Sequence, residues 1–519
     1  MCGIAAIIGK NKQDPAELTK MLAAISSRGE KKYFDESAEI QTCVLGMNRL
    51  AIVDREHAKQ PISSSDGRYS IVFNGEIYNY KELQKELIEQ GYKFNTDSDT
   101  EVLVNGYAAW GPDMLQKLIG MYAFFIFDTQ NNSFFAARDL FGVKPLYWAQ
   151  DKENTYYFAS EIKSLSQLNQ IEEVKLFPPA HYMKDGVMTQ YWKIPTKINS
   201  QIKEDQAIAE IRKLFDEAIR IRVQTDLPIA VYMSGGIDST AVLATATKYH
   251  NDVTAIIVGN DESSDKQMAI RYCEEKKIKY VVKVPPTEEE LVKDIPWAIK
   301  ASESFEPNMV RQVTLSRYIA LAAAEKGFKV ILCGEGSDEI FAGYPEFTQL
   351  ESNQKIEERI TKFLSDLHRT QLQRVDRTSM AFTTEVREPF LDKNLVEYVL
   401  QISADLKVKK VGEKVITKYI LRKAMEDRLP EYIYNRDKVV LSEGAGYKGN
   451  QKIGGLFYDF VAKEVSDSEL EEYKTKYKDW NLETKEEVYY FKYFLQFGYD
   501  KARFNQERTM VNKTNTYVK

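Results

Sequence analysis

The sequence predicts two folds in one chain: a β-rich α+β domain, then an α/β domain with a parallel sheet and a helical C-terminal part. The chain has 519 residues, too many for one compact core, since domains usually run to roughly 100–200 residues. Short strand patterns separated by glycine, asparagine and aspartate fill residues 1–195. From residue 206, apolar strands alternate with helical patterns, which indicates a parallel sheet with crossover helices.

The first domain is expected to span residues 1–195. Helices are expected at 15–27 and at 80–90, where Leu83, Leu87 and Ile88 recur at helical spacing and predict one shared face. Its strands are expected at five apolar runs, Cys2–Ile8, Tyr69–Phe73, Tyr122–Asp128, Phe134–Arg138 and Thr155–Ala159.

The second domain is expected to span residues 206–500, after a polar, proline-containing linker at 196–205. Beyond about residue 350 the pattern is mainly helical, and residues 501–519 are expected to form a polar tail. The strands of the parallel sheet are expected at Pro228–Met233, Val253–Val258, Lys279–Val284 and Lys329–Leu332.

Composition excludes several classes of protein. The net charge is −6 with 71 basic and 77 acidic side chains, which gives no electrostatic reason to expect a nucleic-acid partner. The four cysteines form no CxxC pair and the four histidines no HxxxH pair, so neither a disulfide framework nor a structural zinc site is expected. No apolar run of ~18 residues and no signal peptide is present, so we expect no membrane partner and a cytoplasmic location.

Cys2 directly follows the initiator Met1. If Met1 is removed, Cys2 gains a free α-amine with an unperturbed pKa of roughly 7.7–8.0, which can act as the base for the thiol of the same residue. Alone, position 2 favours a plainer interpretation, in which Cys2 is a small buried apolar residue. The neighbouring motifs decide between the two interpretations.

Three further motifs supply groups suited to an amino-acid amide. Asn74 and Gly75 follow an apolar strand and offer two N–H donors for an oxyanion. The guanidinium of Arg49 suits a carboxylate, and Asp99 can pair with an ammonium group. Each motif alone is as easily a turn, a surface arginine or a helix cap.

Together these motifs resemble the glutaminase domain of the class II glutamine amidotransferases, whose N-terminal nucleophile fold has stacked antiparallel sheets with flanking helices. The resemblance implies that Cys2 is the nucleophile and that Asn74 and Gly75 form the oxyanion hole. The implied glutamine-binding residues are Arg49, Ile52, Val53, Asn74, Gly75, Glu76 and Asp99. The matching motifs, in order, are Cys-Gly-Ile at 2–4, Arg-Leu-Ala-Ile-Val-Asp at 49–54, Asn-Gly-Glu-Ile-Tyr-Asn at 74–79, Ser-Asp-Thr-Glu at 98–101, Ala-Arg-Asp at 137–139, Gly-Val-Lys-Pro-Leu-Tyr at 142–147 and Phe-Ala-Ser-Glu at 158–161.

One loop departs from this family. The family usually has His-Arg-Gly-Pro-Asp where this chain has Ser-Arg-Gly-Glu-Lys at 27–31. Arg28 and Gly29 are kept, but the loop differs, which puts glutamine affinity and loop closure in doubt.

A glycine loop opens the second domain. Ser-Gly-Gly-Ile-Asp-Ser at 234–239 follows an apolar strand and precedes a helical pattern, an arrangement that aims backbone N–H groups at phosphate oxygens. A serine- and glycine-rich helix cap is the common alternative. Asp238 inside the loop weakens that alternative, because an acid beside phosphates suits a magnesium ion.

A second loop repeats this pattern after the strand Lys329–Leu332. It has the sequence Cys-Gly-Glu-Gly-Ser-Asp-Glu at 333–339, and Asp338 is the second candidate magnesium ligand. Two acids together with phosphate fit the preference of Mg²⁺ for few protein ligands. The two loops together are typical of ATP pyrophosphatases.

This half resembles the synthetase domain of the glutamine-hydrolysing asparagine synthetase family, and the resemblance covers nearly the whole chain. Further motifs lie in family order at 379–381, 385–392 and 436–438. The resemblance implies that Glu335 and Lys438 belong to the reaction centre, that Asp238 and Asp338 hold Mg²⁺, and that Arg311 binds the acceptor. The implied ATP-binding residues are Ser234, Gly235, Gly236, Asp238, Ser239, Val258, Gly259, Cys333 and Gly334.

The implied reaction is ATP-dependent amidation of a carboxylate, most simply that of aspartate, through an acyl-adenylate and with ammonia from glutamine. Such a reaction requires an internal passage for ammonia, and the family suggests a homodimer. The alternative is amidation of another carboxylate in a natural-product or envelope pathway, because the sequence around Arg311 departs from the usual pattern. Phosphoribosyl and fructose-6-phosphate amidotransferases resemble this chain only in the first domain, and the glycine loop of the second domain excludes them.

Overall fold

The structure, a computed structural model, describes residues 2–31, 36–439 and 455–509. Its N-terminal half contains two six-stranded sheets in which neighbouring strands are antiparallel. The first sheet has the order β10 (Lys175–Leu176), β8 (Tyr147–Gln150), β9 (Tyr156–Ala159), β1 (Gly3–Ile8), β3 (Cys43–Asn48) and β2 (Glu36–Ile40). The second has the order β12 (Val187–Gln190), β11 (His181–Lys184), β7 (Ser133–Arg138), β6 (Gly120–Asp128), β5 (Tyr69–Ile77) and β4 (Ile62–Ser63).

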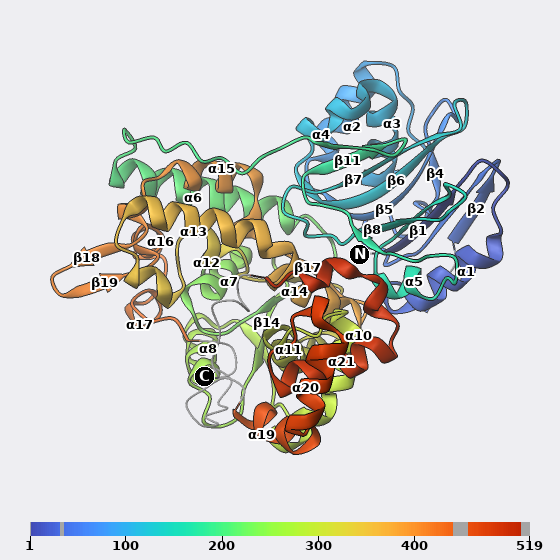
Figure 1. Ribbon diagram of the computed structural model, residues 1–519. Coiled ribbons are helices and arrows are strands. Elements are labelled where there is room, and N and C mark those ends of the chain that lie inside the picture. The colour runs from blue at the N-terminus through green and yellow to red at the C-terminus, as the bar shows by residue number, and fades with distance from the viewer. Residues whose placement is uncertain (1, 32–35, 440–454, 510–519) are drawn as a thin grey trace.

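The two antiparallel sheets enclose a common core. Side chains alternate along a strand, so Ile4 and Ala6 of β1 pack in one cluster with Phe125 of β6, while Ala5 and Ile7 belong to another cluster on the opposite face. Flanking helices cover the outer faces (Figure 1). They are α1 (Pro15–Ala24), α2 (Tyr80–Glu89), α3 (Asp99–Trp110), α4 (Met114–Lys117) and α5 (Ile162–Ser166).

The predicted buried face of the helix at 80–90 is correct for two residues and wrong for the third. Leu83 and Leu87 are buried, whereas Ile88 is 55% exposed. Consecutive helical residues are about 100° apart around the axis, so the side chain after Leu87 points away from the core.

The C-terminal half is built on one five-stranded parallel sheet. The parallel arrangement is as predicted, and four of the five strands lie where the sequence predicts them. Its order is β15 (Lys279–Lys283), β14 (Val253–Val258), β13 (Ile229–Tyr232), β16 (Val330–Leu332) and β17 (Glu385–Arg387). Around it lie α6 (Glu204–Arg222), α7 (Ile237–Tyr249), α8 (Ser264–Lys276), α9 (Glu288–Leu291), α10 (Ile295–Ser302), α11 (Pro307–Glu325), α12 (Ser337–Ile340), α13 (Asn353–Asp366), α14 (Gln371–Met380), α15 (Lys393–Gln401), α16 (Tyr419–Met425), α17 (Glu431–Tyr434), α19 (Gly455–Glu464), α20 (Asp467–Lys476) and α21 (Lys485–Gln496).

Two short features interrupt the region that the sequence predicts to be mainly helical. Strand β17 completes the parallel sheet, and β18 (Lys409–Val411) pairs with β19 (Lys414–Ile416) in a hairpin that projects from the molecule (Figure 1). Each has only three residues, too few to show the alternation by which strands are recognised.

The halves share hydrophobic cores. One cluster joins Ile7 of β1 and Leu22 of α1 to Ile299 of α10 and Phe491 of α21. The expected polar tail also joins the two halves. Nζ of Lys501 donates to the carbonyls of Ser166 and Leu168 in the N-terminal half, at 2.8 and 2.9 Å. Residues 510–519 lie outside the described part. No helix in the described part is long and apolar enough to cross a bilayer.

Candidate active sites

The backbone of Cys2 is held from both sides at the start of β1. Its N–H donates to Asn74 Oδ1 at 2.9 Å, and its carbonyl accepts from Arg28 Nε at 2.9 Å. The residue is only 7% exposed. Burial raises the pKa of the Cys2 thiol above its usual value, while a backbone hydrogen bond from Leu50 and the charge of Arg49 oppose the rise. A thiol of this kind needs a base. The expected base is the Cys2 nitrogen itself, which removal of Met1 would turn into a free α-amine; Met1 lies outside the described residues.

Asn74 and Gly75 lie beside this thiol on β5. The Nδ2 atom of Asn74 is buried and makes no hydrogen bond within the described residues, which leaves a donor available beside Cys2. A Cβ on Gly75 would lie 2.1 Å from the carbonyl oxygen of Met121, so only glycine fits there. Both features suit an oxyanion hole, which needs donors fixed before the charge develops.

A cavity beside Cys2 brings most of the predicted glutamine-binding residues together. The guanidinium of Arg49 lies in its wall and donates to the carbonyls of Ala58 and Arg55 at 2.5 and 2.6 Å. The cavity is lined by Cys2, Arg49, Leu50, Ala51, Ile52, Val53, Ala58, Gln60, Phe73, Gly75, Glu76, Ser98, Asp99, Thr100 and Glu385.

Two of the three acids of this cavity, Asp99 and Glu76, have raised pKa values, whereas neighbouring positive charges lower that of Glu385 to about 2 although burial opposes this. Burial raises the pKa of Asp99 to about 6 and that of Glu76 to about 8. Arg387 opposes these shifts; its guanidinium lies 3.0 Å from a Glu76 oxygen and 2.7 Å from a Glu385 oxygen. Glu385 and Arg387 come from β17 of the other half and were missed by the sequence analysis. Burial disfavours the ionised forms of Asp99 and Glu76, so a cationic ligand beside them would favour those forms.

The altered loop at 27–31 contacts both halves. Glu30, one of its non-family residues, accepts from the N–H of Ala51 at 3.2 Å and pairs with Lys329 of the C-terminal half at 2.9 Å. A Cβ on Gly29 would lie 2.6 Å from the backbone carbon of Asn48. The loop therefore keeps a close backbone approach and replaces the usual residues with an ion pair between the halves.

The two glycine loops meet in the parallel sheet. Strands β14 and β15 lie on one side of β13, and β16 and β17 lie on the other. The loops after β13 and β16 therefore leave the sheet where its strand order reverses, which is where open parallel sheets bind ligands. A Cβ on Gly334 would lie only 2.9 Å from Cβ of Asp238, so the loops are in direct contact.

The first loop is closed by its own hydroxyl groups. The N–H of Ser234 donates to Ser239 Oγ at 3.1 Å. Gly235 has φ +70°, and a Cβ there would lie 2.8 Å from the backbone nitrogen of Ala269, so glycine is required. Of the two predicted adenosine contacts at the end of β14, Gly259 donates its N–H to the Lys283 carbonyl at 3.3 Å. The adjoining cavity is lined by Ser234, Gly236, Ile237, Asp238, Asp265, Gly343, Thr417, Lys418, Arg422, Arg436, Asp437, Lys438 and Val439, and so does not include Val258 or Gly259.

The two predicted magnesium ligands share a lysine. Nζ of Lys418 lies 2.6 Å from Asp238 Oδ2 and 2.7 Å from Asp338 Oδ1, and Nζ of Lys438 lies 2.7 Å from Asp338 Oδ2. Burial would raise the pKa of Asp338, but the two lysines hold it below its usual range. Ser337 Oγ donates to Asp238 at 2.6 Å. The pair of carboxylates thus already binds a positive charge between them, which is the chemistry a metal site needs, although no cluster of three or more acids, histidines or cysteines occurs in the described residues.

Lys418 was not predicted as a site residue, because nothing in the lysine-rich stretch before α16 distinguishes it from its neighbours.

The arginine predicted to bind the acceptor lies in a different contact. Arg311 of α11 forms an ion pair with Glu486 of α21, and the Tyr490 hydroxyl donates to the same carboxylate at 2.6 Å. Glu335, in the loop that begins at Cys333, is contacted by the guanidinium of Arg374. The role of Arg311 therefore stays a prediction.

The fold and its two sites define a class of protein. The N-terminal half has stacked antiparallel sheets with a cysteine at the start of one strand, which is typical of a glutamine amidotransferase domain. The C-terminal half has a parallel sheet with glycine loops where its strand order reverses, which is typical of a nucleotide-dependent synthetase domain. The protein is therefore a fusion of these two kinds of domain. Family sequence profiles agree, since the glutamine amidotransferase domain matches residues 1–209 and the asparagine synthase domain matches residues 210–361 and 348–496.

Similar proteins extend this match along almost the whole chain. The chain is 31% identical to asparagine synthetase [glutamine-hydrolyzing] 2 of Oryza sativa subsp. japonica, over 96% of this chain and 85% of the relative. It is 31% identical to an asparagine synthetase [glutamine-hydrolyzing] of Asparagus officinalis (97% and 87% covered) and 30% identical to a probable one of Dictyostelium discoideum (95% and 93%). The chain belongs to the family of glutamine-hydrolysing asparagine synthetases. A solved glutamine phosphoribosylpyrophosphate amidotransferase from B. subtilis aligns with 16% identity and a TM-score of 0.31, over 69% of this chain and 89% of that one, a likeness too distant to add to this assignment.

Proposed function

We propose that this protein converts aspartate to asparagine, using ATP to activate the carboxylate and glutamine to supply ammonia. The products are AMP, pyrophosphate and glutamate. One observation carries the proposal. The same chain has both a cavity around Cys2 and a pair of glycine loops that meet where the parallel sheet reverses its strand order.

In the first site, Cys2 attacks the side-chain amide of glutamine. The α-amine of Cys2 accepts the thiol proton, and Asn74 with Gly75 donates to the oxyanion. Arg49 faces the substrate carboxylate, and Asp99 with Glu76 faces its ammonium group. Ammonia leaves, and water hydrolyses the thioester to glutamate.

In the second site, the substrate carboxylate attacks the α-phosphorus of ATP, forming an acyl-adenylate and releasing pyrophosphate. The N–H groups and hydroxyls of Ser234–Ser239 face the phosphates. Lys438 would stabilise the charge of the transition state, and Glu335 is assigned to the same reaction centre. Ammonia then displaces AMP from the activated carbonyl.

Magnesium fits this second site. Asp238 and Asp338 would hold it, because both carboxylates face one shared cation in Lys418, and two acids with phosphate oxygens suit Mg²⁺. When bound, the ion would neutralise phosphate charge. Lys418 must then leave at least one of the two acids.

We propose a cytoplasmic homodimer in which residues 1–195 form the glutaminase domain, 196–205 the linker and 206–500 the synthetase domain. Arg311 is proposed to bind the acceptor after separating from Glu486, and Val258 and Gly259 to contact the adenosine.

The test is mass spectrometry of the product formed from glutamine, ATP, Mg²⁺ and aspartate. Asparagine, with one AMP for each asparagine formed, is the expected result. A panel of other carboxylic acids distinguishes aspartate from an alternative acceptor. Amidation of one of these acids with no amidation of aspartate would contradict the proposed substrate.

A further inference from the structure

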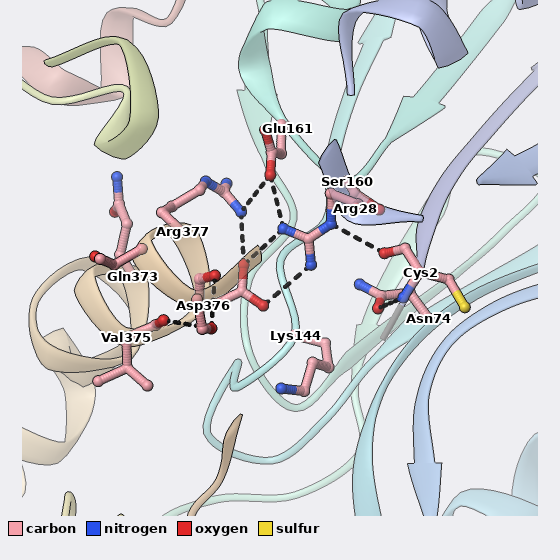
Figure 2. Close-up of polar contacts among 12 residues, drawn as sticks. Cys2, Arg28, Asn74, Lys144, Ser160, Glu161, Gln373, Val375, Asp376 and Arg377 are labelled. Carbon is pink, nitrogen blue, oxygen red and sulfur yellow. Dashed lines mark hydrogen bonds and ion pairs between the residues drawn. The ribbon is translucent and has the colours of Figure 1, made fainter. Parts of the chain in front are cut away.

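The carbonyl of Cys2 is anchored through Arg28 to the opposite half of the protein. Arg28 is fully buried and donates through Nε to the Cys2 carbonyl. Its other two nitrogens reach both carboxylate oxygens of Asp376 in α14, at 2.8 and 3.0 Å, and one also reaches Glu161 at 2.7 Å. Figure 2 shows this guanidinium lying between the nucleophile and the helix.

The charges around Arg28 form a buried network. Arg377 pairs with Asp376 at 3.0 Å and with Glu303 at 3.2 Å, and Lys163 pairs with Glu161 at 2.6 Å. Burial works against ionisation of Asp376, but Arg28 holds its pKa below the usual range. Two parallel N–H···O bonds to one carboxylate fix direction as well as distance. Asp376 therefore sets the orientation of the Arg28 guanidinium.

Helix α14 is itself fixed to the C-terminal half. Gln373 donates to the Ser302 carbonyl at 2.6 Å, and Arg374 donates to Ser316 Oγ at 3.0 Å. Arg374 also contacts Glu335 in the loop after β16. The carboxylate that orients Arg28 thus belongs to a helix whose own position is set by the synthetase half.

A small shift of Arg28 would act on the reacting atoms. Cys2 is held between the Arg28 guanidinium on its carbonyl and Asn74 on its N–H, and the free donor of Asn74 lies beside it. A misplacement of about 1 Å in an active site can cost roughly 100-fold in rate. Because Arg28 contacts the backbone of Cys2 and does not line the cavity, such a shift alters the rate more than glutamine binding.

We propose that Asp376 is a positioning residue for glutamine hydrolysis: it acts through Arg28 on Cys2, so that the synthetase half holds the nucleophile of the glutaminase half in place. This inference rests on the proposed function of Cys2 and adds a residue to it from the other half.

The test is Asp376→Asn, which removes the charge and keeps the size. The matched control is Asp226→Asn. Asp226 also accepts two hydrogen bonds from one arginine of the N-terminal half, Arg55, at 2.8 and 3.0 Å. Asp226 is 72% exposed, and its ion pair with Arg55 does not involve Cys2. Steady-state glutamine hydrolysis and ammonium-dependent product formation are measured for both variants.

In Asp376→Asn, kcat for glutamine hydrolysis is expected to fall about 10- to 100-fold, with KM for glutamine and ammonium-dependent synthesis within about threefold of the parent. Asp376→Glu should recover part of the lost kcat, and the control should change neither activity. Unchanged kcat, an effect on KM alone, or an equal loss of both activities would overturn the proposal, the last because it indicates a general folding role. If the parent enzyme itself hydrolyses no glutamine, the proposed function fails instead.

Discussion

Two acids beside Cys2 and one acid between the glycine loops have pKa values shifted in opposite directions. Beside Cys2, burial raises the pKa of Asp99 to about 6 and that of Glu76 to about 8. Between the glycine loops, Lys418 and Lys438 hold the pKa of Asp338 below its usual range. In the first site, the buried carboxyl groups of Asp99 and Glu76 suit a ligand that brings an ammonium group. The second has its own cations and suits a polyanion.

The largest expected effect separates the sites completely. Cys2→Ala removes the nucleophile, so glutamine-dependent asparagine formation should fall by about 10,000-fold or more. Synthesis from added ammonium should persist, because the second site is unchanged. Product formation from each nitrogen source measures this. A parallel loss of both activities would falsify the division of labour.

The next effect is expected in the second site. Asp338→Asn removes a carboxylate bound by Lys418 and Lys438, and both glutamine- and ammonium-dependent synthesis should fall roughly 100- to 1,000-fold. Glutamine hydrolysis should continue. Asp437→Asn is the control, since Asp437 lines the same cavity but is 80% exposed and pairs with Lys414 at 3.3 Å. Normal pyrophosphate release by Asp338→Asn would contradict the role of Asp338.

A smaller effect tests the raised pKa values of Asp99 and Glu76 directly. An acid with a raised pKa becomes negative only as the pH rises through that value, so KM for glutamine should fall between about pH 5 and pH 8 as Asp99 and Glu76 ionise. Asp99→Asn should raise KM about 10-fold or more at pH 8, the scale of one lost hydrogen bond to a charged group, and should flatten the lower part of the pH profile. A KM independent of pH in the parent enzyme would refute the assignment.

The smallest effect concerns the altered loop. Glu30 and Lys329 are partly exposed, at 22% and 29% of their side chains, and such ion pairs contribute about 0–1 kcal/mol. Lys329→Met should therefore change the unfolding free energy by less than about 1 kcal/mol and leave kcat for glutamine unchanged. Chemical denaturation and glutaminase kinetics measure both. A large fall in kcat would show that the loop depends on this contact.

Local sequence patterns predict the features that short stretches of the chain encode. The fold class is confirmed, and the predicted Arg49, Glu76 and Asp99 meet around one cavity, because each lies in a motif next to a strand or at a helix start. Glu385 was missed because its strand has three residues within a mainly helical region. Lys418 was missed because only tertiary folding brings it between two acids distant in sequence.

Strand β17 has a consequence for dividing this enzyme. Its Glu385 forms part of the wall beside Cys2, while the Arg387 carbonyl accepts from the N–H of Cys333 in the second loop at 3.1 Å. A separately expressed N-terminal fragment would lack that wall, expose its share of the common cores, and leave Arg28 without Asp376, where breaking a buried ion pair costs about 3–5 kcal/mol. A split version of this protein is therefore expected to use glutamine only when both fragments are produced together and reassemble.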